Sequence, residues 1–196
     1  NFSSGKMGIA IAEALADKGA QVTLVLGPSK EHTYHTLVNT VHVESAHEMY
    51  NAAHTAFKDS HIAVLAAAVA DYKPQMQATE KIKKKESELT LTLTKTEDIL
   101  ASLGKIKQQW QTLIGFALET TNELEHATNK LTSKNADMIV LNSLRDDGAG
   151  FGHDTNKITL IIKNNEPIAL PLQSKTAAAG ALADQILELR HAKKTV

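Results

Sequence analysis

The sequence contains no cysteine among its 196 residues. Disulfide bonds, thiolate metal ligands and a cysteine nucleophile are therefore excluded, and the composition agrees with a reducing compartment. No apolar run approaches the roughly 20 residues that a membrane-spanning helix needs. The first residues also lack the pattern of a signal peptide. We therefore expect a cytoplasmic protein without a membrane partner.

The sequence also lacks an excess of charge of one sign. Lysine and arginine total 21 against 22 acidic residues, so the formal net charge is −1. Such a chain has no overall field that attracts nucleic acid, and a basic binding site would have to be local. Its length suits one domain with a proper hydrophobic core.

Several motifs of common enzyme classes are absent. The nine histidines are scattered without metal-ligand spacing, and no HExxH occurs, so they are better interpreted as structural or surface residues. The Gly-x-Ser-x-Gly motif of hydrolases and the Walker A motif are missing. The residues between Gly5 and Gly8 do not form GxGxxG, and no acid is placed to hold an adenosine ribose. These absences disfavour an ordinary dinucleotide dehydrogenase.

Apolar periodicity alternates along the chain between the patterns of strands and helices. We predict buried strands over residues 21–26, 41–43, 62–69, 112–117 and 137–142. Helices are expected between Gly5 and Gly19, over 45–58 and 97–107, from Asn122, and from Ser174. Alternation at this spacing predicts a Rossmann-like three-layer α/β sandwich with a mostly parallel sheet.

Three finer patterns complete the predicted fold. Strict alternation over 89–94 predicts a strand with one buried face, and residues 157–162 and 167–172 around Asn164-Asn165 predict an appended hairpin before the last helix. The helix from Asn122 should direct Leu124, Ala127 and Leu131 inward. A strand normally precedes a turn like Ser3-Ser4-Gly5, so we expect the natural protein to extend upstream.

The stretch from His61 to Lys85 carries the strongest signal of a binding site. A buried strand ends in small residues and Asp71, and the basic cluster Lys81, Lys83, Lys84 and Lys85 follows. Ligands of open α/β sheets bind at the carboxyl ends of the strands, where an acid can bind a base or ribose and lysines can bind phosphate. Taken alone, the lysines would more often form only a solvated surface.

Two further patterns favour an anionic ligand. Ser4, Gly5 and Gly8 lie at the start of the first helix, where free amide groups and the helix dipole suit a phosphate or sugar. Lys130 and Lys134 are four residues apart, so both lie on one helix face and can bind one polyanion together. Exposed lysine pairs with this spacing are also common without any function.

Five strings of residues occur in one order along the chain and resemble a known family. They are NFSSGKMG from Asn1, AAVADY from Ala67, EKIKK from Glu80, GFALET from Gly115 and GFGHDTN from Gly150. Together they look like the bacterial phosphopantothenate-cysteine ligase domain of coenzyme A biosynthesis, over residues 1–196. In bacteria this domain is commonly fused behind a phosphopantothenoylcysteine decarboxylase, so FMN is expected only if such a domain lies upstream.

The resemblance implies a two-step reaction and a set of site residues. CTP and Mg²⁺ would activate the carboxylate of 4′-phosphopantothenate as an acyl-cytidylate, and cysteine would then displace CMP. Lys81 would stabilise the first transition state, and Asn1 would hold the acyl intermediate. The implied nucleotide-binding residues are Ala67, Ala68, Asp71, Lys81, Glu97, Asp98, Ile99, Leu100, Phe116, Lys130 and Lys134. Glu97 replaces a proline that is more usual in the family, and the metal ligands are not implied.

The resemblance also implies a homodimer joined by sheet augmentation, for which the hairpin at 157–172 is a candidate edge. The residues alone do not distinguish CTP from ATP. They also leave two alternatives open: a nucleotide-binding Rossmann-like module without catalysis, and an NAD(P)-dependent reductase.

Overall fold

The computed structural model describes residues 3–76, 80, 89–119, 121–143 and 155–194. A five-stranded sheet in the order β10-β9-β7-β6-β3 forms its centre. Strands β3 (Ile62–Leu65), β6 (Thr112–Glu119) and β7 (Met138–Ser143) are parallel, whereas β9 (Ile158–Ile162) runs antiparallel to β7 and β10 (Ile168–Ala169) antiparallel to β9. This arrangement confirms the predicted mostly parallel sheet with an appended hairpin.

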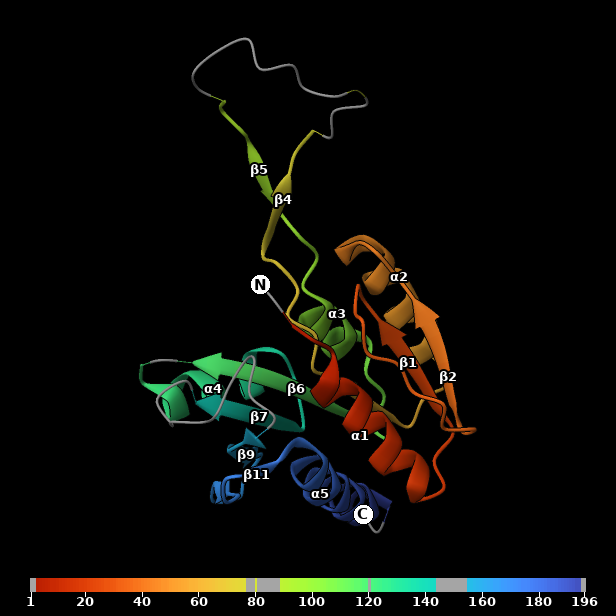
Figure 1. The fold of residues 1–196 in the computed structure, drawn as a ribbon. Coiled ribbons are helices and arrows are strands. Elements are labelled where there is room, and N and C mark those ends of the chain that lie inside the picture. Colours follow the sequence, from red (N-terminus) through yellow and green to blue (C-terminus); the bar gives the residue numbers. More distant parts are fainter. Residues whose placement is uncertain (1–2, 77–79, 81–88, 120, 144–154, 195–196) are drawn as a thin grey trace.

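A second parallel pair stands beside this sheet (Figure 1). It consists of β1 (Val22–Leu26) and β2 (Val38–His42). Within the described residues, β1 pairs only with β2, and β3 pairs only with β6. One hydrophobic core nevertheless reaches both pairs, because Val22 of β1 and Ile62 of β3 pack against the same cluster. The two sheets therefore belong to one domain.

Helices cover both faces of the central sheet. On one face, α1 (Lys6–Asp17) packs beside α5 (Lys175–Lys194), and their apolar residues meet β6, β7 and β9 in a core that includes Ile11, Val140 and Leu182. On the other face lie α2 (Ala46–Phe57), α3 (Ile99–Ile106) and α4 (Glu123–Ser133), which enclose Leu103, Leu113 and related residues. The predicted three layers are confirmed. No helix in the described ranges is both long enough and apolar enough to span a bilayer.

The local sequence explains where the helices begin. Ser45 caps α2 through a capping box, in which its Oγ accepts from the Glu48 amide at 3.2 Å while the Glu48 carboxylate accepts from the Ser45 amide. Gly5 precedes α1 with a φ of 82°, a conformation that glycine adopts without strain. Ser174 accepts from the Ala177 amide at the start of α5. All three starts agree with the sequence prediction.

Two predictions about buried residues are wrong. The strand expected over 89–94 is instead a three-residue strand β5 (Leu93–Lys95), paired with β4 (Tyr72–Pro74) in an arm that projects from the body (Figure 1). Leu89, Leu91 and Leu93 are all more than half exposed, because a two-stranded arm has no second layer to cover a face. Leu124 is 52% exposed, since the first turn of α4 lies past the region in which Ala127 and Leu131 are buried.

The central strand is also shorter than predicted. It ends at Leu65, opposite Gly115 of β6, rather than at residue 69. The residues that follow are small and give the chain little side-chain area to pack on the sheet, so it leaves the sheet toward the arm. Two further short strands, β8 (Thr155–Asn156) and β11 (Gln173–Ser174), pair next to β9.

Candidate active site

The turn before α1 lies beside the carboxyl end of β1. The Ser29 hydroxyl donates to the Ser4 carbonyl at 2.7 Å. A Cβ atom on Gly5 would lie 3.0 Å from Ser29 Oγ and 3.3 Å from a methyl group of Leu26. The backbone angle therefore favours glycine at residue 5, and any Cβ there would be in tight contact with Ser29 and Leu26. Gly8 has open space around the position of a Cβ, which leaves this first turn accessible to a ligand.

The segment that leaves β3 is held near the start of α3. The Asp71 carbonyl accepts from the Thr96 amide at 2.9 Å, and the Thr96 hydroxyl donates to the Ala70 carbonyl at 2.5 Å. Ala67 and Asp71 are exposed and Ala68 is half-buried. Because these residues are small or exposed, the backbone here is accessible at the same edge as the predicted phosphate turn.

Asp98 connects the start of α3 to the end of α4. One carboxylate oxygen caps α3 by accepting from the Ala101 amide at 2.8 Å, and the other accepts from Lys134 Nζ at 2.8 Å. Partial burial alone would raise the pKa of Asp98, but the hydrogen bonds from Lys134 and Ala101 outweigh it and lower the pKa. Asp98 therefore remains a carboxylate that holds a lysine in place.

Lys130 reaches the strand that carries Phe116. Its Nζ donates to the Phe116 carbonyl at 2.9 Å. The preceding residue, Gly115, allows Leu100 of α3 to pack directly on β6, because a Cβ there would lie 2.5 Å from a Leu100 methyl group. Ile99 and Leu100 are buried in the core. Their side chains are therefore not accessible to a nucleotide.

The structure thus brings most of the predicted nucleotide-binding residues to one edge. Asp71 is connected to the start of α3 through Thr96, and Asp98 at that start pairs with Lys134. Lys130 lies close enough to affect the charge of Asp98 and contacts the Phe116 carbonyl. Both lysines now bind protein oxygens, so an incoming phosphate would exchange for these contacts. Lys81 and Asn1, the two predicted catalytic residues, lie outside the described residues, as do Lys83, Lys84 and Lys85.

One charged network at this edge was not predicted from the sequence. One carboxylate oxygen of Glu97 lies 2.8 Å from His47 Nδ1, and the other lies 3.5 Å from Lys73 Nζ. The contact with His47 is the main cause that lowers the pKa of Glu97. The network joins α2, the base of the arm and the start of α3. Because His47 is fifty residues from Glu97, no local spacing could have indicated it.

Cation ligands are sparse in this region. Among the residues that the structure describes, no group of three or more histidine, aspartate, glutamate or cysteine side chains could hold a metal ion.

Comparison with known proteins identifies related sequences over nearly the whole chain. Residues 1–189 match the family described as the DNA/pantothenate metabolism flavoprotein C-terminal domain. A protein named Cysteine/Cysteine sulfinic acid decarboxylase, from an unknown prokaryotic organism, is 50% identical over 97% of this chain and 53% of its own length. The Coenzyme A biosynthesis bifunctional protein CoaBC of Bacillus subtilis is 40% identical over 96% of this chain and 46% of its own length. The chain therefore spans about half the length of these curated relatives.

Solved structures agree with the sequence comparison. The C-terminal domain of a Coenzyme A biosynthesis bifunctional protein CoaBC is 42% identical and superposes with a TM-score of 0.79, covering 95% of this chain and 83% of that one. A Cab2 mutant in complex with phosphopantothenate-cysteine is only 15% identical, and its TM-score of 0.73 shows a shared fold. Sequence and fold together show that the chain belongs to the family of DNA/pantothenate metabolism flavoprotein C-terminal domains.

Proposed function

We propose that this chain is a phosphopantothenate-cysteine ligase domain of coenzyme A biosynthesis, extending over residues 1–196. The CoaBC relatives and the CoaBC C-terminal domain structure support this assignment by their names and similarity. The observation that carries it is the contact of Lys130 with the Phe116 carbonyl, near the ion pair of Lys134 with Asp98. The sheet edge at which they lie suits a nucleotide and an anionic acid.

In the first step, a carboxylate oxygen of 4′-phosphopantothenate attacks the α-phosphorus of CTP. The bond from that phosphorus to the bridging oxygen breaks, pyrophosphate leaves, and an acyl-cytidylate forms. Several negative charges meet during this step, so positive groups lower its barrier. Lys130 and Lys134 would exchange their protein contacts for phosphate oxygens, and Lys81 would stabilise the transition state.

In the second step, the amino group of cysteine attacks the acyl carbon. The carbon–oxygen bond to CMP breaks, the nitrogen loses a proton, and the amide forms. Asn1 would hold the acyl intermediate, since an amide side chain both donates and accepts. Asp71 and the backbone of Ala67 and Ala68 would bind the base or ribose. The resemblance favours CTP over ATP.

The remaining partners follow the same proposal. Mg²⁺ would enter bound to the triphosphate and neutralise its charge, with Asp71 as an exposed carboxylate at the same edge. A decarboxylase domain with FMN would occupy the part of the relatives' length that this chain does not cover. A homodimer would use the outer edge of β10, which no described strand pairs.

The direct test is the release of pyrophosphate from CTP. We expect release that depends on 4′-phosphopantothenate, followed by an amide product only when cysteine is added. Lys81→Ala should abolish release while the melting temperature is unchanged, and Lys163→Ala, at an exposed hairpin turn, should change neither. Normal release by the Lys81 variant would contradict its assigned role.

The same assay separates the rival functions. A nucleotide-binding module would bind CTP without releasing pyrophosphate, and an NAD(P)-dependent reductase would oxidise NAD(P)H instead. Carbon dioxide from cysteine, in the absence of CTP, would favour the activity in the name of the 50% identical relative. For Asn1→Asp we expect the acyl-cytidylate to accumulate while amide formation stops. Equal loss of both steps would contradict the role of Asn1.

A further inference from the structure

Three side-chain amides, each with one buried oxygen or nitrogen atom, lie together at the carboxyl edge of the sheet. Asn142 is near the end of β7, Asn156 is in β8, and Gln173 is directly opposite Asn156 in β11. Asn142 pairs with Ile158, two residues after Asn156, so the two asparagines are diagonal neighbours on one face. Amide groups thus replace apolar residues where the core reaches this edge.

These amides lack hydrogen-bond partners. Across the described ranges, four buried side-chain polar atoms have none: Asn142 Oδ1, Asn156 Oδ1, Gln173 Nε2 and Thr112 Oγ1. Three of the four belong to this cluster, and Asn156 is only 2% exposed. An unsatisfied buried polar atom costs about 1–3 kcal/mol. A cluster of them is therefore expected to have a partner that the protein itself does not supply.

The face on which the cluster lies relates it to the candidate site. Met138 and Val140 of β7 face the core beneath α1 and α5, so alternation puts Asn142 on that face. The amide nitrogen of Asn156 is 3.9 Å from the sulfur of Met7, in the first turn of α1. Phe116 pairs with Val140, one row inward from Asn142. The cluster thus lies between the glycine turn and the predicted nucleotide strand.

A groove of about 420 Å³ opens at the same corner of the molecule. Its walls include Lys6, which precedes Met7, and Ser174, which follows Gln173. The groove adjoins the amide cluster only through these sequence neighbours, since Asn142, Asn156 and Gln173 are not among its lining residues.

The free atoms specify the chemistry of the partner. Two are acceptor oxygens and one is a donor nitrogen. Phosphates and carboxylates offer no hydrogen to an acceptor oxygen, whereas a hydroxyl or an amide can both donate and accept. The charged side chains that are predicted to bind the nucleotide, Asp98 and Lys134, meet on the opposite face, beside α3 and α4. The cluster therefore suits a neutral polar chain rather than a triphosphate.

We propose that Asn142, Asn156 and Gln173 form a subsite that binds the hydroxyl and amide groups of the acid substrate. This inference rests on the ligase proposal, under which the acid is 4′-phosphopantothenate. The subsite would hold the middle of that molecule while its carboxylate points toward the nucleotide. The three residues are positioning residues, because they do not contact the reacting atoms.

The test is calorimetric titration of the full protein with 4′-phosphopantothenate, and separately with CTP and Mg²⁺. Asn142→Leu, Asn156→Leu and Gln173→Met remove the amides with little change in shape. We expect each to weaken binding of the acid by about tenfold or more, because a site with unpaired polar groups discriminates strongly, and to leave CTP affinity unchanged. Thr112→Val removes the fourth unpaired atom, at the opposite edge of the sheet, and should leave both affinities unchanged.

The outcomes separate this inference from the ligase proposal. If the acid binds all three variants as tightly as the wild type while their melting temperatures shift, the amides have only a structural role, such as binding internal water, and the subsite is refuted. Gln173→Met decides the question if the asparagine variants do not fold, since Gln173 is only half-buried. A wild type that binds the acid and shows the variant pattern, but releases no pyrophosphate, supports the subsite and refutes the ligase. A wild type that does not bind the acid refutes both.

Discussion

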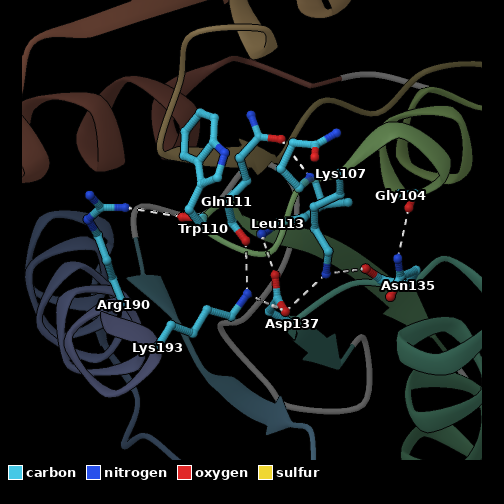
Figure 2. Close-up of polar contacts among 10 residues, drawn as sticks. Gly104, Lys107, Trp110, Gln111, Leu113, Asn135, Asp137, Arg190 and Lys193 are labelled. Carbon is cyan, nitrogen blue, oxygen red and sulfur yellow. Dashed lines mark hydrogen bonds and ion pairs between the residues drawn. The ribbon is translucent and has the colours of Figure 1, made fainter. Parts of the chain in front are cut away.

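At the amino edge of the central sheet, where β6 and β7 begin, a largely buried carboxylate is enclosed by donors from the protein itself. Asp137 accepts from the Leu113 amide at 2.8 Å, and it pairs with Lys107 at 3.0 Å and Lys193 at 2.6 Å (Figure 2). Lys107 also donates to a backbone carbonyl, that of Asn135, at 2.7 Å. At the carboxyl edge, by contrast, Asp71 is exposed, and one amide atom each of Asn142, Asn156 and Gln173 has no hydrogen-bond partner in the part of the chain that the structure describes.

The same difference shows in the titration of the charged groups. Burial is the largest effect on Lys107 and lowers its pKa, even though its contact with Asp137 opposes this. At the carboxyl edge, the hydrogen bond from Lys134 outweighs partial burial and lowers the pKa of Asp98. The amino edge is thus a closed polar network, and the carboxyl edge holds charges that a ligand can exchange. The amino edge thus stabilises the fold, and the carboxyl edge is where we propose that the substrates bind.

The largest expected effect is at the closed edge. Asp137→Ala leaves two lysines and the Leu113 amide without their acceptor, and breaking a buried ion pair typically costs about 3–5 kcal/mol. Urea unfolding should show this loss. The control is Asp184→Ala on α5, whose exposed pair with Lys18 should contribute no more than about 1 kcal/mol. Equal losses in the two variants would show that the amino edge is not a special anchor.

A second variant tests how the two edges are joined. A Cβ on Gly104 of α3 would lie 1.9 Å from the backbone carbonyl of Lys134. Gly104→Ala should therefore push the end of α4 away, cost about 1–3 kcal/mol as overpacking does, and weaken CTP binding by displacing Lys134. Gly180→Ala, which has open space around it on α5, should be neutral or slightly stabilising. Unchanged CTP affinity in the Gly104 variant would separate Lys134 from the nucleotide site.

A smaller effect is expected from the capping residue of α3. Asp98→Ala removes a cap worth about 1 kcal/mol and frees Lys134, whereas Asp98→Asn keeps the cap and removes only the charge. Because the folded pKa lies below the ordinary value of 3.8, the stability from the charge is present above that value and is lost as the pH falls through the folded pKa. When the free energy of unfolding is measured from neutral to acidic pH, Asp98→Asn should approach the stability of the wild type in acid. Asp98→Ala should stay less stable there, because it also lacks the cap. A pH-independent gap between wild type and Asp98→Asn would contradict the ion pair.

The smallest effect concerns the base of the arm. Glu97→Gln removes the charge that pairs with His47 and Lys73, but these groups are solvated, so the melting temperature should not change measurably. Faster amide hydrogen exchange at Tyr72 and Lys73 is the expected local result. His35, which contacts Asp17 at a distant surface, provides a control through Asp17→Asn, which should leave the arm unaffected.

Much of the fold could be predicted from apolar periodicity. The helices, the parallel strands and the final hairpin follow from residues close together in sequence, and the structure confirms them. The leucines over 89–94 show the limit of this reasoning, since alternation indicates that a strand has two faces but not that a second layer covers one. The early end of β3 was likewise unpredictable, because an alanine-rich run reads the same on or off a sheet.

The candidate site was predicted in part. The ion pair between Lys134 and Asp98 brings together two residues that the resemblance had implied separately. The partners of Glu97 and the unpaired amides were not predicted, because neither distance in sequence nor composition shows which polar side chains become buried. The available signal was the position of two asparagines: Asn142 lies at the end of one apolar strand, and Asn156 lies two residues before the next apolar strand.

The most direct test of the contrast between the two edges is amide hydrogen exchange of the full protein, with and without CTP, Mg²⁺ and 4′-phosphopantothenate. The account predicts that ligands slow exchange in the first turn of α1, at Phe116, and at Ala101 and Lys134, while Gln111 and Leu113 at the amino edge do not change. Slowed exchange confined to the amino edge, or no change at any of these amides, would contradict it.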